Sequence, residues 1–224
     1  MNLALFDLDH TLLPLDSDYS WGEFTMRLGW VDPVAFKQRN DEFFAQYQAG
    51  QLDVHDYVRF ATQAVRERSP AEAQAAHAQF MDEVIRPHIK PAALDLIAHH
   101  QQRGDAMVIV TATNEFVTRP IAQALGVSEL IAIELERDGQ GRYTGEIAGT
   151  PSFREGKVTR VAQWLAQRGL QWAQVHTTFY SDSTNDLPLL EQVNEPVATN
   201  PGEGLRAVAQ TRGWRVLELF NSHA

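Results

Sequence analysis

Four acidic residues, arranged in two pairs, have the types and spacing that carry chemistry. Asp7 and Asp9 lie two residues apart after an apolar run, and Asp182 and Asp186 follow another apolar run late in the chain. Carboxylates that share one pocket repel each other, which raises the pKa of one of them or attracts a cation. A hard cation such as Mg²⁺ prefers these oxygen ligands and often binds a substrate phosphate as well. The two pairs therefore predict a magnesium site that handles phosphate.

Lys157 and Thr111 are the two further polar residues that suit such a site. A lysine cannot be a ligand of the cation, but its ammonium group can balance carboxylate charge and hold a phosphoryl oxygen. Thr111 ends an apolar run and offers a hydroxyl donor, next to the backbone N–H groups of the helix expected after it. We expect both side chains to bind the same anionic group.

The elements that must position these residues alternate along the chain. Short apolar runs predict strands at 3–8, 106–111, 175–180 and 195–199, and helical patterns predict helices at 92–103, 155–169, 184–193 and 203–211. Such alternation is typical of an α/β fold with a mainly parallel, Rossmann-like sheet. In these sheets ligands bind beyond the carboxyl ends of the strands, which is where the candidate residues lie.

The segment between the first two expected strands is too long for a plain crossover. Asp32-Pro33, Asp53 and Ser69-Pro-Ala-Glu72 are helix-start signals within it. We therefore expect a small helical cap domain at residues 15–86, inserted into a catalytic core made of residues 1–14 and 87–224. Residues 130–148 contain a glycine-rich turn between two apolar runs and predict a β-hairpin or flap.

Four motifs of the chain resemble those of the haloacid dehalogenase superfamily, in the same order. Phe6-Asp7-Leu8-Asp9-His10-Thr11 resembles its first motif, Val108-Ile-Val-Thr111 its second, Lys157 its third, and Tyr180-Ser-Asp182-Ser-Thr-Asn185-Asp186 its fourth. Each motif alone is a weak signal, but the ordered set is specific. The resemblance implies a Rossmann-like core and a phosphatase that depends on Mg²⁺.

The resemblance also implies a role for each matched residue. Asp7 would be the nucleophile that forms an aspartyl phosphate, and Asp9 the general acid and then the general base. The phosphoryl group would be bound by Thr111, Ala112, Lys157 and Asn185. The Mg²⁺ ion would be held by Asp7, the backbone carbonyl of Asp9, and Asp182, with Asp186 holding its waters or Lys157.

The helical insertion resembles the cap of the phosphoserine phosphatase branch, in subfamily I of the superfamily. In that branch a glutamate faces the substrate amine, which matches Asp16, and an arginine binds the substrate carboxylate, which matches Arg59. The sequence departs from the branch at Thr111-Ala112-Thr113, where Ser-Gly-Gly is usual, and at Ser181, where glycine is usual. These departures leave phosphoserine and histidinol phosphate as substrate hypotheses of comparable weight.

Three functions remain open from the sequence. The first is hydrolysis of a small phosphorylated metabolite. The second is a phosphotransferase or mutase that uses the same residues to pass the phosphoryl group to another alcohol. The third is a binding module that has lost activity, which the complete set of chemical residues disfavours.

The composition of the chain argues against two classes of partner, nucleic acids and membranes. The 224 residues carry a formal net charge of −10, which argues against nucleic acid as a partner. No apolar stretch approaches the roughly 20 residues needed to span a bilayer, and cysteine is absent, so we expect a cytoplasmic enzyme without membrane partners. The oligomeric state is left open. The adjacent pair His99 and His100 is expected to lie on the exposed surface of its helix.

Overall fold

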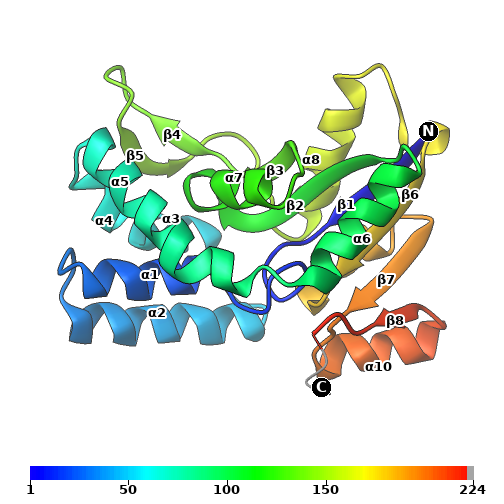
Figure 1. Cartoon of the computed structure of the whole chain (residues 1–224), viewed down its shortest axis with the longest axis horizontal. Coiled ribbons are helices and arrows are strands. Elements are labelled where there is room, and N and C mark those ends of the chain that lie inside the picture. Colours follow the sequence, from blue (N-terminus) through cyan, green and yellow to red (C-terminus); the bar gives the residue numbers. More distant parts are fainter. Residues whose placement is uncertain (221–224) are drawn as a thin grey trace.

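A six-stranded parallel sheet forms the core of the protein, in a computed structural model that describes residues 1–220 (Figure 1). The strand order is β3-β2-β1-β6-β7-β8. The strands are β1 (Asn2–Phe6), β2 (Ala106–Asn114), β3 (Glu129–Ile133), β6 (His176–Ser181), β7 (Glu195–Thr199) and β8 (Arg215–Leu217). The α/β fold class expected from the sequence is confirmed.

The central position of β1 brings the candidate residues together. β1 pairs with β2 on one side and with β6 on the other, both in parallel. The carboxyl ends of these three strands therefore meet at one edge of the sheet. Asp7 directly follows β1, Asp182 directly follows β6, and Thr111 lies in the carboxyl-terminal half of β2. The N–H of Asp7 donates to the carbonyl of Tyr180 at 2.9 Å, which holds the loop after β1 against the end of β6.

Helices cover both faces of the sheet and are separated by short loops. Buried apolar side chains of β1 alternate between the two apolar cores, with Phe6 in one and Leu5 in the other. The helices that cover the two faces of the sheet are α6 (Pro91–Gln102), α7 (Glu115–Ala124), α8 (Glu155–Ala166), α9 (Leu187–Leu190) and α10 (Glu203–Arg212).

The long segment between β1 and β2 forms a helical cap insertion, as expected. Asp32, Asp53 and Ser69 each accept backbone N–H groups at a helix start, and Ser69 forms the full capping box with Glu72. Figure 1 shows α1 and α2 side by side at one end of the molecule. The helices before α6 are α1 (Ser17–Arg27), α2 (Pro33–Gln48), α3 (Val54–Ala61), α4 (Gln63–Arg66) and α5 (Pro70–Phe80), followed by a π-helical turn (Met81–Ile85).

Residues 130–148, predicted to form one hairpin or flap, belong to two different sheets. Glu129–Ile133 is β3, an edge strand of the main sheet that pairs with β2, so its assignment to the flap is wrong. Its apolar run is buried, a pattern that a sheet strand and a flap strand share. The hairpin itself is shorter, formed by β4 (Leu135–Arg137) and β5 (Tyr143–Ile147), and β5 packs against the cap helix α3.

His100 is buried, contrary to the expected exposure of the His99–His100 pair. Its ring nitrogens lie 2.8 Å from a carboxylate oxygen of Asp105 and 2.9 Å from the hydroxyl of Tyr180. Both partners come from other elements, so no helical pattern within α6 could reveal them.

No helix among residues 1–220 combines the length and the apolar character that a membrane crossing requires. The domain boundaries at residues 14/15 and 86/87 stay a prediction, and the last part of the predicted core, residues 221–224, lies outside the described residues.

Replacement of Trp21 tests how the cap is attached to the core. Its ring, 2% exposed, lies 5.3 Å from Phe80 of α5 and 5.5 Å from Phe116 of α7. Trp21→Ala should lower the free energy of unfolding by about 3–5 kcal/mol because it empties a packed site, as measured by urea denaturation. Val34→Ala, at a position 77% exposed, should change it by less than about 0.5 kcal/mol. Equal effects would contradict this packing.

Candidate active site

The loop after β1 turns sharply to present two carboxylates. The carbonyl of Leu8 accepts N–H groups from Leu12 at 2.9 Å and Leu13 at 3.0 Å. His10 takes the left-handed conformation, with φ of 57°, to make this turn. Asn200, after β7, donates to the carbonyl of His10 at 2.9 Å and so holds the loop from the other side.

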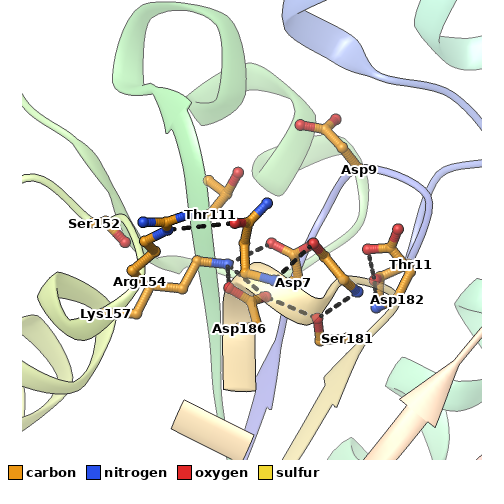
Figure 2. A network of polar contacts seen from close by, with 12 residues as sticks. Asp7, Asp9, Thr11, Thr111, Ser152, Arg154, Lys157, Ser181, Asp182 and Asp186 are labelled. Atoms are coloured by element: carbon orange, nitrogen blue, oxygen red, sulfur yellow. Dashed lines mark hydrogen bonds and ion pairs between the residues drawn. The ribbon is translucent and has the colours of Figure 1, made fainter. Parts of the chain in front are cut away.

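Lys157 lies beneath this loop in a buried ion-pair network (Figure 2). Its ammonium nitrogen is 2.9 Å from Oδ1 of Asp7 and 2.7 Å from Oδ1 of Asp186. The hydroxyl of Ser181 donates to Asp186 at 2.8 Å. All four side chains are buried, so water does not screen these charges. The network joins α8 to the ends of β1 and β6.

The pKa values in this network show an excess of negative charge. Burial lowers the pKa of Lys157, but the carboxylates of Asp186 and Asp7 outweigh it and the net shift is upward, so the lysine stays charged. Burial raises the pKa of Asp186 to about 6 even with Lys157 beside it. The pKa of Asp182 rises well above its usual value because of burial and repulsion by Asp7 and Asp186. One lysine does not balance three carboxylates.

The first and fourth motifs are also joined through Thr11. Its hydroxyl donates to Oδ1 of Asp182 at 3.3 Å and accepts the N–H of Asp182 at 3.1 Å. Thr11 belongs to the first motif, but the sequence alone assigns it no role. Its contacts with Asp182, drawn in Figure 2, depend on the loops after β1 and β6 lying next to each other.

Asp9 points away from Lys157, toward the cap. The N–H of Ser17 donates to its Oδ1 and the hydroxyl of Thr113 to its Oδ2, both at 2.8 Å. Burial, and then repulsion by Asp16, raise the pKa of Asp9 to about 6 despite these hydrogen bonds. A carboxyl group with this pKa can both donate and accept a proton near neutral pH.

A cavity of about 60 Å³ lies between the sheet edge and the cap. The sheet side supplies Asp7, Asp9, Thr111, Ala112 and Asp182, all of which are candidate site residues from the sequence. The cap side is mostly aromatic and includes Tyr19, Phe43, Phe44, Tyr47 and Tyr57.

Two carboxylates from the start of α1 complete the cap side. Asp16 lines the cavity as expected, and it also caps α1 by accepting the N–H of Tyr19 at 2.8 Å. Asp18 lines it too and accepts a hydrogen bond from Asn114 at 3.2 Å. Burial, and then repulsion by Asp16, raise the pKa of Asp18 to about 7. The sequence reading missed Asp18, although its spacing of two from Asp16 repeats that of Asp7 and Asp9.

Arg59 and Asn185 are not among the residues that line this cavity. Arg59 is an exposed side chain of α3, and it pairs with Asp56 at 2.6 Å and with Glu146 of the flap at 3.0 Å. Asn185 donates to the carbonyl of Tyr47 at 2.9 Å and so links the fourth motif to the cap helix α2. Their positions are those of residues that join the cap to the core.

The oxygen ligands available for a cation are few but of the right kind. Within residues 1–220 no three side chains of His, Cys, Asp or Glu gather as a ready metal cluster. The predicted set needs only two carboxylates, Asp7 and Asp182, with the backbone carbonyl of Asp9. Mg²⁺ commonly binds through one or two carboxylates and keeps several waters. The uncompensated charge around Asp182 fits such an ion.

Comparisons of the sequence with known proteins agree with this geometry. The family of haloacid dehalogenase-like hydrolases matches residues 4–191. A histidinol-phosphatase from Neisseria meningitidis serogroup C is 44% identical over 97% of this chain and 99% of that protein. A phosphoserine phosphatase from Mycobacterium tuberculosis is 30% identical, covering 96% of this chain and 70% of that protein.

Solved structures share the architecture. A protein of unknown function from Bordetella pertussis Tohama I has a TM-score of 0.92 and 52% identity, covering 98% of this chain and 99% of that one. A substrate-bound phosphoserine phosphatase has a TM-score of 0.69 and 15% identity, covering 96% of this chain and 92% of that one. At that identity the likeness concerns the fold alone.

Lys157→Met tests whether the buried network depends on its cation. The substitution leaves the buried carboxylates of Asp7 and Asp186 without a cation, so the free energy of unfolding at about pH 8 should fall by about 3–5 kcal/mol, as measured by urea denaturation in magnesium-free buffer. Lys37→Met removes an exposed lysine that pairs with Asp41 and should cost less than about 1 kcal/mol. A stable Lys157→Met protein would show that the network is not needed for folding.

Proposed function

This chain belongs to the haloacid dehalogenase-like hydrolases, and from that premise we propose that it hydrolyses the phosphate ester of a small amino alcohol, with histidinol phosphate as the best candidate. The observation that carries the proposal is the cavity itself. Its sheet side holds residues of the first, second and fourth motifs, and Lys157 of the third motif binds Asp7 from outside the lining. Its cap side presents carboxylates and aromatic rings but no arginine or lysine.

Asp7 is the proposed nucleophile. It sits at the carboxyl end of the central strand, and Lys157 holds its Oδ1 at 2.9 Å. Attack of its carboxylate on phosphorus forms an aspartyl phosphate and breaks the bond between phosphorus and the ester oxygen. Thr111 and the backbone around Ala112 line the same space and are placed to receive the phosphoryl oxygens.

Asp9 is the proposed proton carrier. In its protonated form it gives a proton to the leaving alkoxide, and it then takes a proton from the water that attacks the aspartyl phosphate. Ser17 and Thr113 hold its two oxygens, so the side chain is oriented before substrate arrives. Its pKa of about 6 allows both states near neutral pH.

Asp7, Asp182 and the backbone carbonyl of Asp9 would hold a Mg²⁺ ion. When bound, the ion supplies positive charge that offsets the charge of the transferring phosphoryl group. Asp186 is occupied by Lys157 and Ser181, so we assign it to the support of Lys157. A cytoplasmic location stays a prediction.

The cap side of the cavity selects the leaving group. Asp16 and Asp18 would pair with an ammonium group, and the surrounding aromatic rings would pack against an imidazole. Among the described residues, none that lines the cavity is an arginine or a lysine. A substrate carboxylate would therefore be buried beside two acidic residues without a partner, which is costly. This favours histidinol phosphate over phosphoserine.

The cavity lies between the cap and the core, so a movement of the cap would change the access of substrate to it. The contacts of Asn185 with α2 and of Arg59 with Glu146 hold the cap against the core. A closed cap excludes water other than the attacking molecule during transfer.

A substrate screen with Mg²⁺ tests the activity. Histidinol phosphate should give a kcat/KM at least about tenfold above that of phosphoserine, because the cavity lacks a partner for the carboxylate. Asp7→Asn should lower kcat by at least about a thousandfold, whereas Asp41→Asn, at an exposed position, should not. Preference for phosphoserine would overturn the substrate assignment, and an unchanged Asp7→Asn would overturn the mechanism.

Asp18→Asn tests recognition of the amine. It should reduce kcat/KM for histidinol phosphate by about ten- to a hundredfold, the effect of losing one charge-assisted hydrogen bond. Turnover of p-nitrophenyl phosphate, which has no amine, should stay within about twofold. The matched control is Glu23→Gln, an exposed position on the same helix. An equal loss on both substrates would assign Asp18 to the shared chemistry instead.

The same variant should show how much Asp18 lowers the free energy of unfolding of the wild type. Its raised pKa, about 7, means that the folded protein keeps a proton that the unfolded chain releases, so wild-type stability falls as pH rises toward 7. Asn carries no such proton, and the variant should gain up to about 4 kcal/mol over wild type between about pH 4 and pH 8. Urea denaturation without magnesium measures this gain, and a pH-independent difference would contradict it.

A further inference from the structure

A second hollow, which we name the arginine groove, lies between the cap, α7 and the flap. Its volume is about 530 Å³, several times that of the catalytic cavity. Its walls come from the cap helices α4 and α5, from α7 of the core, and from the β4–β5 flap. It shares no lining residue with the catalytic cavity.

Six arginines line this groove, in a chain whose formal net charge is −10. The two acidic residues that also line it, Asp82 and Glu115, are each paired with an arginine of the next helical turn, Arg86 and Arg119. The other arginines are Arg66, Arg68, Arg137 and Arg142. The groove is thus a concentration of positive charge on an acidic protein.

Three of these arginines have no carboxylate partner among residues 1–220. Arg66 donates to the backbone carbonyls of Arg59 and Thr144, at 2.9 and 3.5 Å. Arg68 lies over the ring of Trp30, and Arg137 donates to the hydroxyl of Tyr143 at 2.6 Å. A guanidinium group that neighbours only neutral acceptors and rings keeps its charge available for an anion.

The backbone helps to hold Arg66 in place. Gly145 of β5 has φ of 96°, and a Cβ at this position would lie 2.9 Å from the guanidinium carbon of Arg66. A side chain at this position would displace the guanidinium group of Arg66, and the positive φ also favours glycine. Arg66 therefore lies against the flap strand, at the boundary between the cap and the core.

The base of the groove is apolar. Val65, Ala73 and Met81 come from the cap, and Phe116 and Pro120 come from α7. An apolar base beneath a rim of guanidinium groups suits a molecule that has an apolar body and several negative charges. Inorganic phosphate would leave the base uncovered.

We propose that the arginine groove binds a small organic anion that carries two or more acidic groups on an apolar or aromatic body. Such a ligand would touch the cap through Arg66 and Arg68 and the core through Arg137 and Phe116. It would therefore bridge the cap and the core. The site is independent of the phosphatase proposal, because no residue of the catalytic cavity takes part.

Pyrenetetrasulfonate is a suitable probe because it is aromatic, polyanionic, fluorescent and free of any phosphate ester. Its fluorescence anisotropy should rise with wild-type protein to one saturable site, with weaker binding at high salt. Arg66→Gln with Arg137→Gln should weaken binding by about a hundredfold, near tenfold for each charge-assisted contact. The control, Arg39→Gln with Arg212→Gln, removes two exposed arginines outside the groove and should bind as wild type.

Several outcomes would overturn the proposal. These are an absence of saturable binding, equal affinity in the groove variant and the wild type, and an equal loss in the control variant. If the double variant fails to fold by circular dichroism, Arg68→Gln alone, at the rim, should still weaken binding by about tenfold. Light scattering that shows a dimer released by the groove variant would instead assign the groove to a second copy of the chain.

Discussion

The centre of this protein depends on a lysine that is buried between two carboxylates. An ammonium group loses its hydration when it is buried, and only well-placed partners repay that loss. Lys157 has them in Asp7 and Asp186, at 2.9 and 2.7 Å. The three groups come from α8, from the end of β1 and from the loop after β6. These elements must therefore meet at one point, and in meeting they aim Asp7 at the cavity.

The site holds more negative charge than Lys157 balances, and this excess favours positively charged ligands. Burial and the acidic neighbours raise the pKa of Asp182, which suits a divalent ion at the phosphoryl end of the cavity. At the other end, Asp16 and Asp18 form an acidic patch among aromatic rings. A buried carboxylate without a cation costs stability, so these two residues are best explained by an ammonium group that arrives with the substrate. The two ends therefore complement opposite charges of one molecule.

The cap joins these functions to the rest of the fold. Trp21 of α1 packs against Phe80 and Phe116, so the helix that carries Asp16 and Asp18 is anchored on α7. Asn114, which precedes α7, binds Asp18 directly, and Phe116 also forms part of the base of the arginine groove. A ligand in that groove would thus contact the same helix that positions the acidic patch.

The sequence by itself determined the residues whose position follows from strand order. Asp7, Thr111 and Asp182 lie at or near the carboxyl ends of neighbouring parallel strands, and the geometry of such sheets brings these ends together whatever the side-chain packing. The tertiary structure alone decided contacts between segments that no periodicity links. Asp18 lines the cavity and Arg59 forms an ion pair with Glu146, and both contacts depend on how the cap lies on the core. Local patterns determine elements and their ends, whereas the packing of one element on another depends on side chains that lie far apart in the chain.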